Sequence, residues 1–144
     1  MDNKRKGGVT ELQCQAYLYR LGYDIAIPFG ENSRYDLILD VDGHLLRVQV
    51  KTSEEIEDGV FRFSCISTRI NRTRVSRHTY SANEVDFFAT IYKDICYLVP
   101  IAECVTYKTL RLKPAKNGQA TSVNFAADYE ASVQINKYLN QHKP

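Results

Sequence analysis

Hydrophobic and polar residues alternate in two runs, 35–41 and 44–51, that are separated by Asp42-Gly43. This pattern predicts a β-hairpin, because a two-residue type I′ turn needs positive φ at both positions and Asp-Gly accepts that conformation. If Val41 pairs with His44, one face of the hairpin is largely apolar and should pack against the core. Its members are Tyr35, Leu37, Leu39, Val41, Leu46, Val48 and Val50.

The opposite face of the same hairpin gathers polar side chains at its open end. In this register Asp36 lies opposite Gln49, and Lys51 follows on the same face. A carboxylate, an amide and an ammonium would then meet where a metal ion and a phosphate could bind. The simpler interpretation is a half-buried hairpin whose outer residues are only solvated, so the pattern needs support from elsewhere in the chain.

A helical period before the hairpin predicts a helix over about 8–21 that Gly22 ends in a left-handed conformation. Its apolar side, expected to face the core, comprises Val9, Leu12, Ala16 and Tyr19, flanked by Leu18 and Leu21. Glu11 would lie in the first turn, where the helix dipole alone favours a carboxylate. A helix and strands carrying Glu11, Asp36, Gln49 and Lys51 in this order are nevertheless a far rarer combination than any one of these features.

The remaining chain predicts further strands and a C-terminal helix. Alternating or apolar runs predict strands at 23–28, 59–66, 86–92 and 95–99, with the last two paired around Lys93-Asp94. The helix is expected at 127–138, with Ala127, Ala131, Ile135 and Tyr138 on one side, and 114–122 is expected to be a loop. The sum is an α/β fold in which a mixed central sheet is flanked by helices.

These patterns together resemble the PD-(D/E)xK nuclease superfamily, and within it the endonucleases associated with bacterial group I introns. The segments that carry the resemblance are Gly8-x-x-Glu11, Pro28-Phe29-Gly30, Tyr35-Asp36-Leu37, 47–53, 80–89 and 97–101. Tyr35 replaces the family proline, and Gln49 replaces an acidic ligand, as in similar intron-associated members. The resemblance implies a restriction-endonuclease-like core within a single nuclease domain, 1–144.

The resemblance also implies Mg²⁺-dependent hydrolysis of phosphodiester bonds in double-stranded DNA, with Mn²⁺ as a substitute metal. The expected catalytic residues are Glu11, Asp36, Gln49 and Lys51. The expected metal ligands are Glu11, Asp36, Gln49 and the carbonyl of Val50, because Mg²⁺ prefers oxygen ligands. Lys51 would position the attacking water or neutralise the charge that grows on the phosphate.

Basic residues are unevenly distributed, although the net charge is only +2. No acidic residue occurs between Gly59 and Asn83, where we expect DNA contacts from Arg69, Asn71, Arg72, Arg74, Arg77 and His78. A solvated polar loop is the alternative. A second basic run, 108–116, is a weaker candidate. Residues 1–7 are expected to form a flexible arm whose Lys4, Arg5 and Lys6 follow the phosphates.

Several function classes are disfavoured by what the sequence lacks. Four separate cysteines without a C-x2-C pair favour reduced thiols. No run suits a membrane span or a signal peptide, so a cytoplasmic protein without membrane contact is expected. The sequence contains neither a glycine-rich phosphate loop nor a zinc-hydrolase histidine motif, so no nucleotide cofactor is expected.

The favoured hypothesis is a sequence-specific DNA endonuclease, most simply an intron-encoded homing endonuclease. Since one centre cuts one strand, a double-strand break implies a homodimer or a homotetramer. Two alternatives stay open. A Holliday-junction resolvase shares the motif, and a non-catalytic DNA-binding module would result if Gln49 marks a degenerate site.

Overall fold

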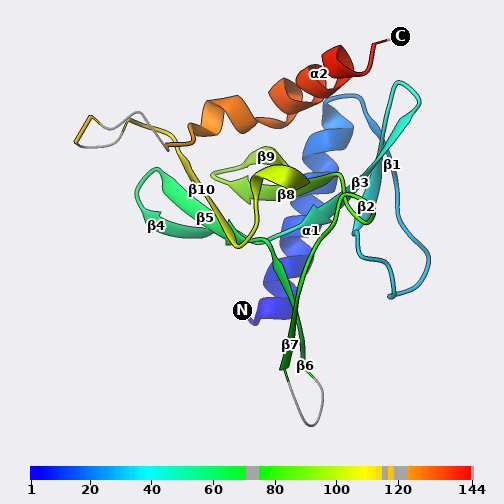
Figure 1. Ribbon diagram of the computed structural model, residues 1–144, viewed down its shortest axis with the longest axis horizontal. Coiled ribbons are helices and arrows are strands. Elements are labelled where there is room, and N and C mark those ends of the chain that lie inside the picture. Colours follow the sequence, from blue (N-terminus) through cyan, green and yellow to red (C-terminus); the bar gives the residue numbers. More distant parts are fainter. Residues whose placement is uncertain (71–74, 115–116, 119–122, 144) are drawn as a thin grey trace.

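The computed structural model describes residues 1–70, 75–114, 117–118 and 123–143 (Figure 1). Its helical elements are α1 (Asn3–Arg20), the 3₁₀ turns η1 (Ile101–Glu103) and η2 (Ala126–Tyr129), and α2 (Ala131–Gln141). Its strands are β1 (Asp24–Ala26), β2 (Leu37–Val41), β3 (His44–Val50), β4 (Glu54–Glu57), β5 (Val60–Ser64), β6 (Ile66–Ile70), β7 (Val75–Thr79), β8 (Phe87–Tyr92), β9 (Ile95–Pro100) and β10 (Tyr107–Arg111).

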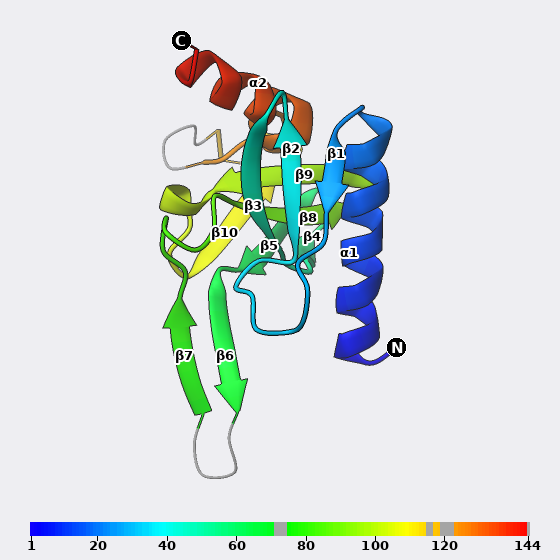
Figure 2. The same cartoon turned by 90° about the vertical axis from the view of Figure 1, so that its right-hand side faces the viewer.

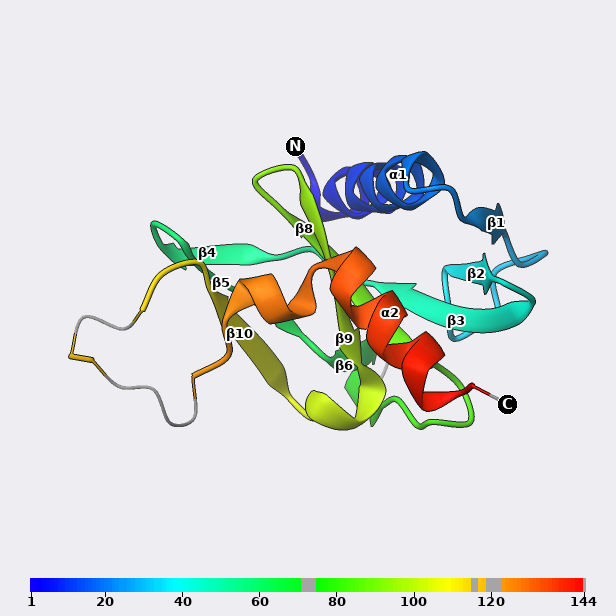
Figure 3. The same ribbon diagram turned by 90° about the horizontal axis from the view of Figure 1, so that it is seen from above.

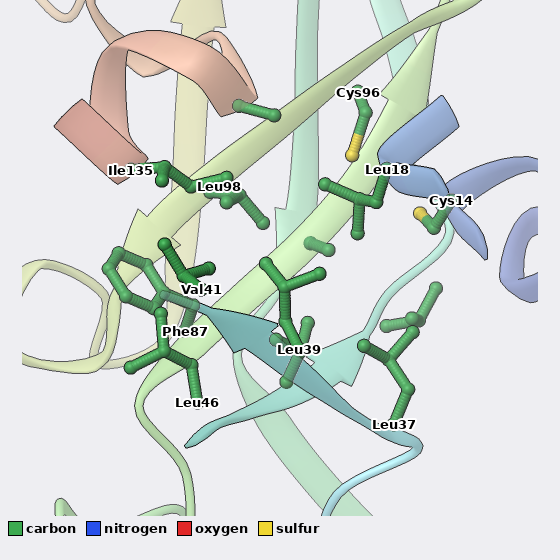
Figure 4. Close-up of a cluster of buried hydrophobic side chains, with 14 residues drawn as sticks. Cys14, Leu18, Leu37, Leu39, Val41, Leu46, Phe87, Cys96, Leu98 and Ile135 are labelled. Carbon is green, nitrogen blue, oxygen red and sulfur yellow. The ribbon is translucent and has the colours of Figure 1, made fainter. Parts of the chain in front are cut away.

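A five-stranded mixed sheet forms the centre, in the order β1-β2-β3-β8-β9. The β3–β8 pair is parallel and the other three pairs are antiparallel. Residues of α1 and α2 pack on one face of this sheet in a single apolar cluster, part of which Figure 4 shows. The other face packs against the β10-β5-β4 sheet, seen to one side of the central strands in Figure 3. The predicted mixed sheet with flanking helices is therefore confirmed.

The β2–β3 hairpin has the predicted turn and register. Asp42 and Gly43 both have positive φ, 50° and 87°, and Val41 pairs with His44. The side chains expected to face the core are buried from Leu37 to Val50, while Tyr35 is half-buried. The β8–β9 hairpin around Lys93-Asp94 is likewise confirmed.

Helix α1 begins five residues earlier than predicted. Asp2 is its N-cap and accepts a hydrogen bond from the Arg5 backbone N–H at 2.8 Å. Such a cap satisfies one of the otherwise unpaired N–H groups of the first turn, which stabilises an earlier start. The expectation of a flexible arm over 1–7 is therefore wrong, because Lys4, Arg5 and Lys6 lie in the helix.

The face of α1 that contacts the sheet also differs from the prediction. Thr10, Cys14 and Leu18 are buried, whereas the predicted core side is exposed, including Val9, Leu12, Ala16 and Tyr19. Two apolar rows run along this helix, and periodicity alone cannot choose between them. The Thr10 hydroxyl donates to the Lys6 carbonyl at 2.9 Å, so this polar side chain can be buried at little cost.

The basic segment, for which a solvated polar loop was the alternative to a DNA contact, contributes two strands. β6 and β7 pair from Ile66↔Thr79 to Ile70↔Val75 and form a separate two-stranded sheet. Figure 2 shows this hairpin extending away from the rest of the chain. The sequence analysis also missed β4 and β10. In the C-terminal region a 3₁₀ turn precedes α2, and Ala127 is exposed rather than packed. Most of the predicted loop 114–122 lies outside the described residues.

The cysteines only partly follow the prediction of reduced thiols. Cys14 and Cys96 are free and buried, but Cys65 and Cys104 form a disulfide with a Cα–Cα distance of 6.0 Å. These two residues are 39 positions apart in the sequence, so their spacing gave no sign of the pairing. In the described part of the chain, no helix combines the length and apolar character that crossing a membrane would require.

Candidate functional site

Asp36 lies at the open end of the β2–β3 hairpin, held against β3 by two backbone hydrogen bonds. Its own N–H donates to the Val48 carbonyl at 2.9 Å, and its Oδ2 accepts from the Val50 N–H at 2.8 Å. The Asp36 N–H thus bonds to Val48, the residue that also pairs with Leu37, so the strand register ends at Leu37 and the placement of Asp36 opposite Gln49 stays a prediction. One carboxylate oxygen of Asp36, Oδ2, is thus fixed by the backbone of β3.

Glu11 extends from the middle of α1 toward Asp36, close enough for the two carboxyl groups to affect each other's pKa. Burial raises the pKa of Glu11, and the adjacent Asp36 carboxyl raises it further. Burial also raises the pKa of Asp36, against the opposing effects of the Val50 N–H and the Lys51 ammonium. The expectation that Glu11 lies in the first turn is wrong, so the helix dipole does not account for this carboxylate.

A second contact joins α1 to the strand that carries the site. The hydroxyls of Thr10 and Thr52 lie 3.1 Å apart and hydrogen-bond to each other. Thr10 precedes Glu11 and Thr52 follows Lys51, so this bond brackets the two predicted site residues. It explains how α1 can hold Glu11 at a fixed position next to β3.

Lys51 directly follows β3 and its ammonium is half-buried near Asp36. Its Nζ donates to the Ile66 carbonyl at 3.1 Å, and its backbone N–H donates to the Ala89 carbonyl at 2.8 Å. Burial lowers the pKa of Lys51, while the Asp36 carboxylate opposes this shift. The ammonium is thus held by the first residue of β6 and lies within the electrostatic influence of the Asp36 carboxylate.

Gln49 and Val50 complete the predicted set. Gln49 pairs with Phe88 of β8 in the parallel register, and its half-buried side chain has no hydrogen-bond partner among the described residues. Val50 buries its side chain in the core and gives its N–H to Asp36. The structure thus brings Glu11 and Lys51 close enough to Asp36 for that carboxyl to affect both of their pKa values, and it places Gln49 and Val50 on the strand that holds Asp36.

The donor chemistry of this cluster suits a hard divalent cation. Two carboxyl groups in contact repel each other when both are ionised, and a bound cation removes that repulsion. Amide and carbonyl oxygens are further ligands for such ions. Within the described ranges no three His, Cys, Asp or Glu side chains form a metal-binding group. A metal here would thus depend on two carboxylates supplemented by neutral oxygens.

Two residues absent from the predicted site lie directly beside it. The Tyr80 ring centroid is 5.1 Å from the Lys51 ammonium and 4.1 Å from the Arg34 guanidinium. Arg34 is also paired with Glu84, Nε to Oε2, at 2.8 Å. Tyr80 begins the segment 80–89 that carried the family resemblance, whereas nothing in the sequence analysis singled out Arg34. The sequence feature that could have pointed to Arg34 is its position as a basic residue two places before Asp36.

Asp86, which lies in the same segment as Tyr80, has a structural role. Its Oδ2 accepts from the Arg47 backbone N–H at 2.8 Å and from the Arg47 Nε at 3.1 Å. Its own N–H donates to the Arg47 carbonyl at 2.9 Å. These bonds hold the chain between β7 and β8 against β3.

The predicted DNA-contact residues fall into three groups. Lys4, Arg5 and Lys6 lie at the start of α1. Three others lie on strands of the projecting hairpin, namely Arg69 on β6 and Arg77 and His78 on β7. Asn71, Arg72 and Arg74 lie outside the described residues. In the weaker basic run, Lys108 is buried and donates to the Tyr129 hydroxyl at 3.2 Å, so it is not a surface cation.

Comparison with known proteins identifies the fold and the family of this chain. A solved structure described as that of a bacterial homing endonuclease, I-Ssp6803I, superposes with a TM-score of 0.77 over 100% of both chains at 24% sequence identity. That likeness concerns the fold. The comparison with curated proteins gave no match. The PD-(D/E)XK endonuclease family model matches residues 1–132. Since this match covers most of the 144 residues, the chain belongs to the PD-(D/E)XK endonuclease family.

Proposed function

We propose that this protein is a Mg²⁺-dependent, sequence-specific endonuclease that hydrolyses phosphodiester bonds in double-stranded DNA, and that it is an intron-encoded homing endonuclease. The observation that carries the proposal is the Asp36 carboxylate, which the Val50 N–H fixes at 2.8 Å and which lies close enough to Glu11 and Lys51 to affect both of their pKa values, in a chain of a nuclease family. The homing activity is suggested by the fold shared with I-Ssp6803I, itself described as a homing endonuclease.

The metal ligands in this proposal are the carboxylates of Glu11 and Asp36, the amide oxygen of Gln49 and the carbonyl of Val50. When bound, Mg²⁺ or its substitute Mn²⁺ supplies polarisation of the scissile phosphate and a lower pKa for the attacking water. The Val50 N–H contributes by fixing Oδ2 of Asp36 at 2.8 Å, which orients the carboxylate before DNA arrives. Such preorganisation avoids the cost of ordering a ligand during the reaction.

Lys51 acts on the phosphate as a positive charge in a partly desolvated position. Electrostatic stabilisation is stronger in such a site than in water, because less solvent screens the charge. An ammonium has three donors. Lys51 can therefore keep its bond to the Ile66 carbonyl, at 3.1 Å, while it donates to an oxygen of the scissile phosphate.

The decisive experiment is incubation of the purified protein with Mg²⁺ and a duplex that carries the intron-less allele of the gene flanking this reading frame. A double-strand cut at one position supports the proposal. A four-way junction and a metal-free binding assay run in parallel. Cutting confined to the junction would identify a resolvase, and DNA binding without any cutting would identify a non-catalytic module. Either result would contradict the proposed function.

One centre per chain hydrolyses one strand, so we propose that a homodimer or homotetramer of this nuclease domain, 1–144, makes the double-strand cut in the cytoplasm. Light scattering of the protein with and without its duplex tests the assembly. A mass of one chain on cut-competent DNA would contradict it.

A further inference from the structure

The base of the β6–β7 hairpin is held on both of its strands by two cationic side chains. One is Lys51 of the candidate site, and the other is Arg34 beside it. The Lys51 ammonium donates to the Ile66 carbonyl at 3.1 Å, and Nη2 of Arg34 donates to the Thr79 carbonyl at 3.0 Å. Ile66 and Thr79 are paired with each other in the hairpin register. One cation from each side thus binds the same rung of the hairpin, at the end that joins the body of the protein.

Arg34 is itself held in place by several contacts. Besides the Thr79 carbonyl, it pairs with Glu84 at 2.8 Å and its guanidinium lies 4.1 Å from the centroid of the Tyr80 ring. Tyr80 in turn meets Phe88 edge to face, with centroids 5.5 Å apart. Only 18% of the Arg34 side chain is exposed. The planar guanidinium therefore links the hairpin base to the central sheet through an aromatic ring.

These side-chain contacts matter because the hairpin shares no strand pairing with the other sheets of the described structure. A two-stranded hairpin on its own has little intrinsic stability in water. Its direction relative to the site must then be set by the residues at its base, among which Arg34 and Lys51 supply the charged hydrogen bonds. Hydrogen bonds from charged donors are stronger than neutral ones.

We propose that Arg34 is a positioning residue that, together with Lys51, fixes the direction of the β6–β7 hairpin and so determines which phosphate of the bound duplex lies at Asp36. The inference rests on the proposed function for its DNA part. The basic hairpin holds the duplex, and its base is bonded to the ammonium that acts on the phosphate. Arg34 thereby keeps a fixed distance between the hairpin surface that binds DNA and the site where the phosphate is cut. It does not touch the reacting atoms.

The hairpin contact is tested without DNA or metal by hydrogen exchange of the full chain. Arg34→Met should increase the exchange rate of amides in 66–70 and 75–79 by about tenfold, because local opening of the hairpin becomes easier. Exchange in β2 and β3 should stay at the wild-type rate. Unchanged exchange in the hairpin would overturn the proposal.

A matched control is Arg62→Met on β5. Arg62 also pairs with a glutamate, Glu54, at 2.9 Å, and also lies over a tyrosine ring, that of Tyr107, at 4.8 Å. It should leave hairpin exchange unchanged. If Arg34→Met unfolds the chain, Glu84→Gln tests the same point, since it removes only the charge that holds Arg34. Faster exchange confined to the hairpin in that variant supports the proposal, and no change overturns it.

The DNA part is tested by mapping cut ends on the duplex that the wild-type protein cleaves. Arg34→Met should lower the single-turnover rate at saturating enzyme by about tenfold and spread the cut over neighbouring phosphates, because small misplacements of reacting groups are costly. Arg34→Lys should retain part of the rate but not the single cut position. A sharp cut at the wild-type rate in Arg34→Met would overturn the positioning role. Failure of the wild-type protein to cut would instead contradict the proposed function, and hydrogen exchange would still test the hairpin contact.

Discussion

The backbone N–H of Val50 donates to Oδ2 of Asp36 at 2.8 Å, so the candidate metal ligand is fixed by the residue that precedes Lys51. This bond comes from the hairpin itself rather than from a distant element. It sets the distance between the carboxylate and the ammonium through one short stretch of backbone. Substitutions in this stretch should therefore affect chemistry more than DNA affinity.

Asp36→Ala or Lys51→Ala should abolish cleavage while DNA affinity stays within about tenfold of wild type, because these residues act on the transition state and affinity comes from phosphate contacts elsewhere. Cleavage and gel-shift assays on the same duplex measure both quantities. Asp58→Ala and Lys93→Ala are matched controls, since these residues form an exposed ion pair at 2.6 Å that joins the β4–β5 turn to the β8–β9 turn. Wild-type cutting rates in either site variant would contradict the assignment.

Gln49→Glu should lower the Mg²⁺ concentration needed for half-maximal cleavage, because a carboxylate binds a hard cation more strongly than a neutral amide. Gln49→Ala should raise that concentration or stop cleavage. Titration of Mg²⁺ against the cleavage rate measures the midpoint, with Gln13→Glu on the exposed side of α1 as a control for added charge. An unchanged midpoint with weaker metal-free DNA binding in Gln49→Glu would reject Gln49 as a ligand.

The metal-free protein should lose stability as pH rises through the raised pKa values of Glu11 and Asp36. A raised folded-state pKa means that the folded chain binds the proton more tightly than the unfolded chain. The resulting stabilisation is complete below the ordinary values, 4.5 for Glu11 and 3.8 for Asp36, and is lost at higher pH.

Urea unfolding between acid and neutral pH, without metal, measures this effect. Glu11→Gln should reduce the loss of unfolding free energy as pH rises, and Mg²⁺ should restore stability of the wild-type chain at neutral pH by binding the ionised pair. Identical pH profiles for the wild-type and Glu11→Gln proteins would show that the two carboxyls do not interact as the structure indicates.

Asp2→Ala should lower the free energy of unfolding by about 1 kcal/mol, because it removes the side chain that caps α1. Asp2→Asn keeps a capping oxygen and should be close to wild type. Chemical denaturation followed by circular dichroism measures the difference. Equal stability of the Ala and Asn variants would contradict the Asp2 cap and favour the flexible N-terminal arm that the sequence suggested.

Arg72→Ala or Arg74→Ala, in the segment outside the described residues, should cost about 1–3 kcal/mol of specific binding if the side chain contacts a base. If it contacts a phosphate, the variant should bind DNA of every sequence more weakly. The slope of the logarithm of the binding constant against the logarithm of salt concentration should then fall by about one unit. Binding isotherms at several salt concentrations separate the two cases. No change in affinity or salt dependence would exclude these side chains from the DNA interface.

The β2–β3 hairpin, with its turn at Asp42-Gly43 and its register from Leu37↔Val48 to Val41↔His44, was determined by the sequence itself. The reason is local. A two-residue turn fixes the register, and a period of two then assigns every side chain to a face. The β8–β9 pair followed in the same way from Lys93-Asp94. Each of these predictions needs only residues that are close in the chain.

Only the tertiary structure decided which row of α1 is buried. Both rows have helical spacing, and shape complementarity with β3, β8 and β9 selects the row of Thr10, Cys14 and Leu18. That choice brings Glu11 to Asp36. The Arg34 contact with Thr79 and the Cys65–Cys104 disulfide are likewise invisible in the sequence, because they join residues 45 and 39 positions apart whose approach depends on how the sheets pack.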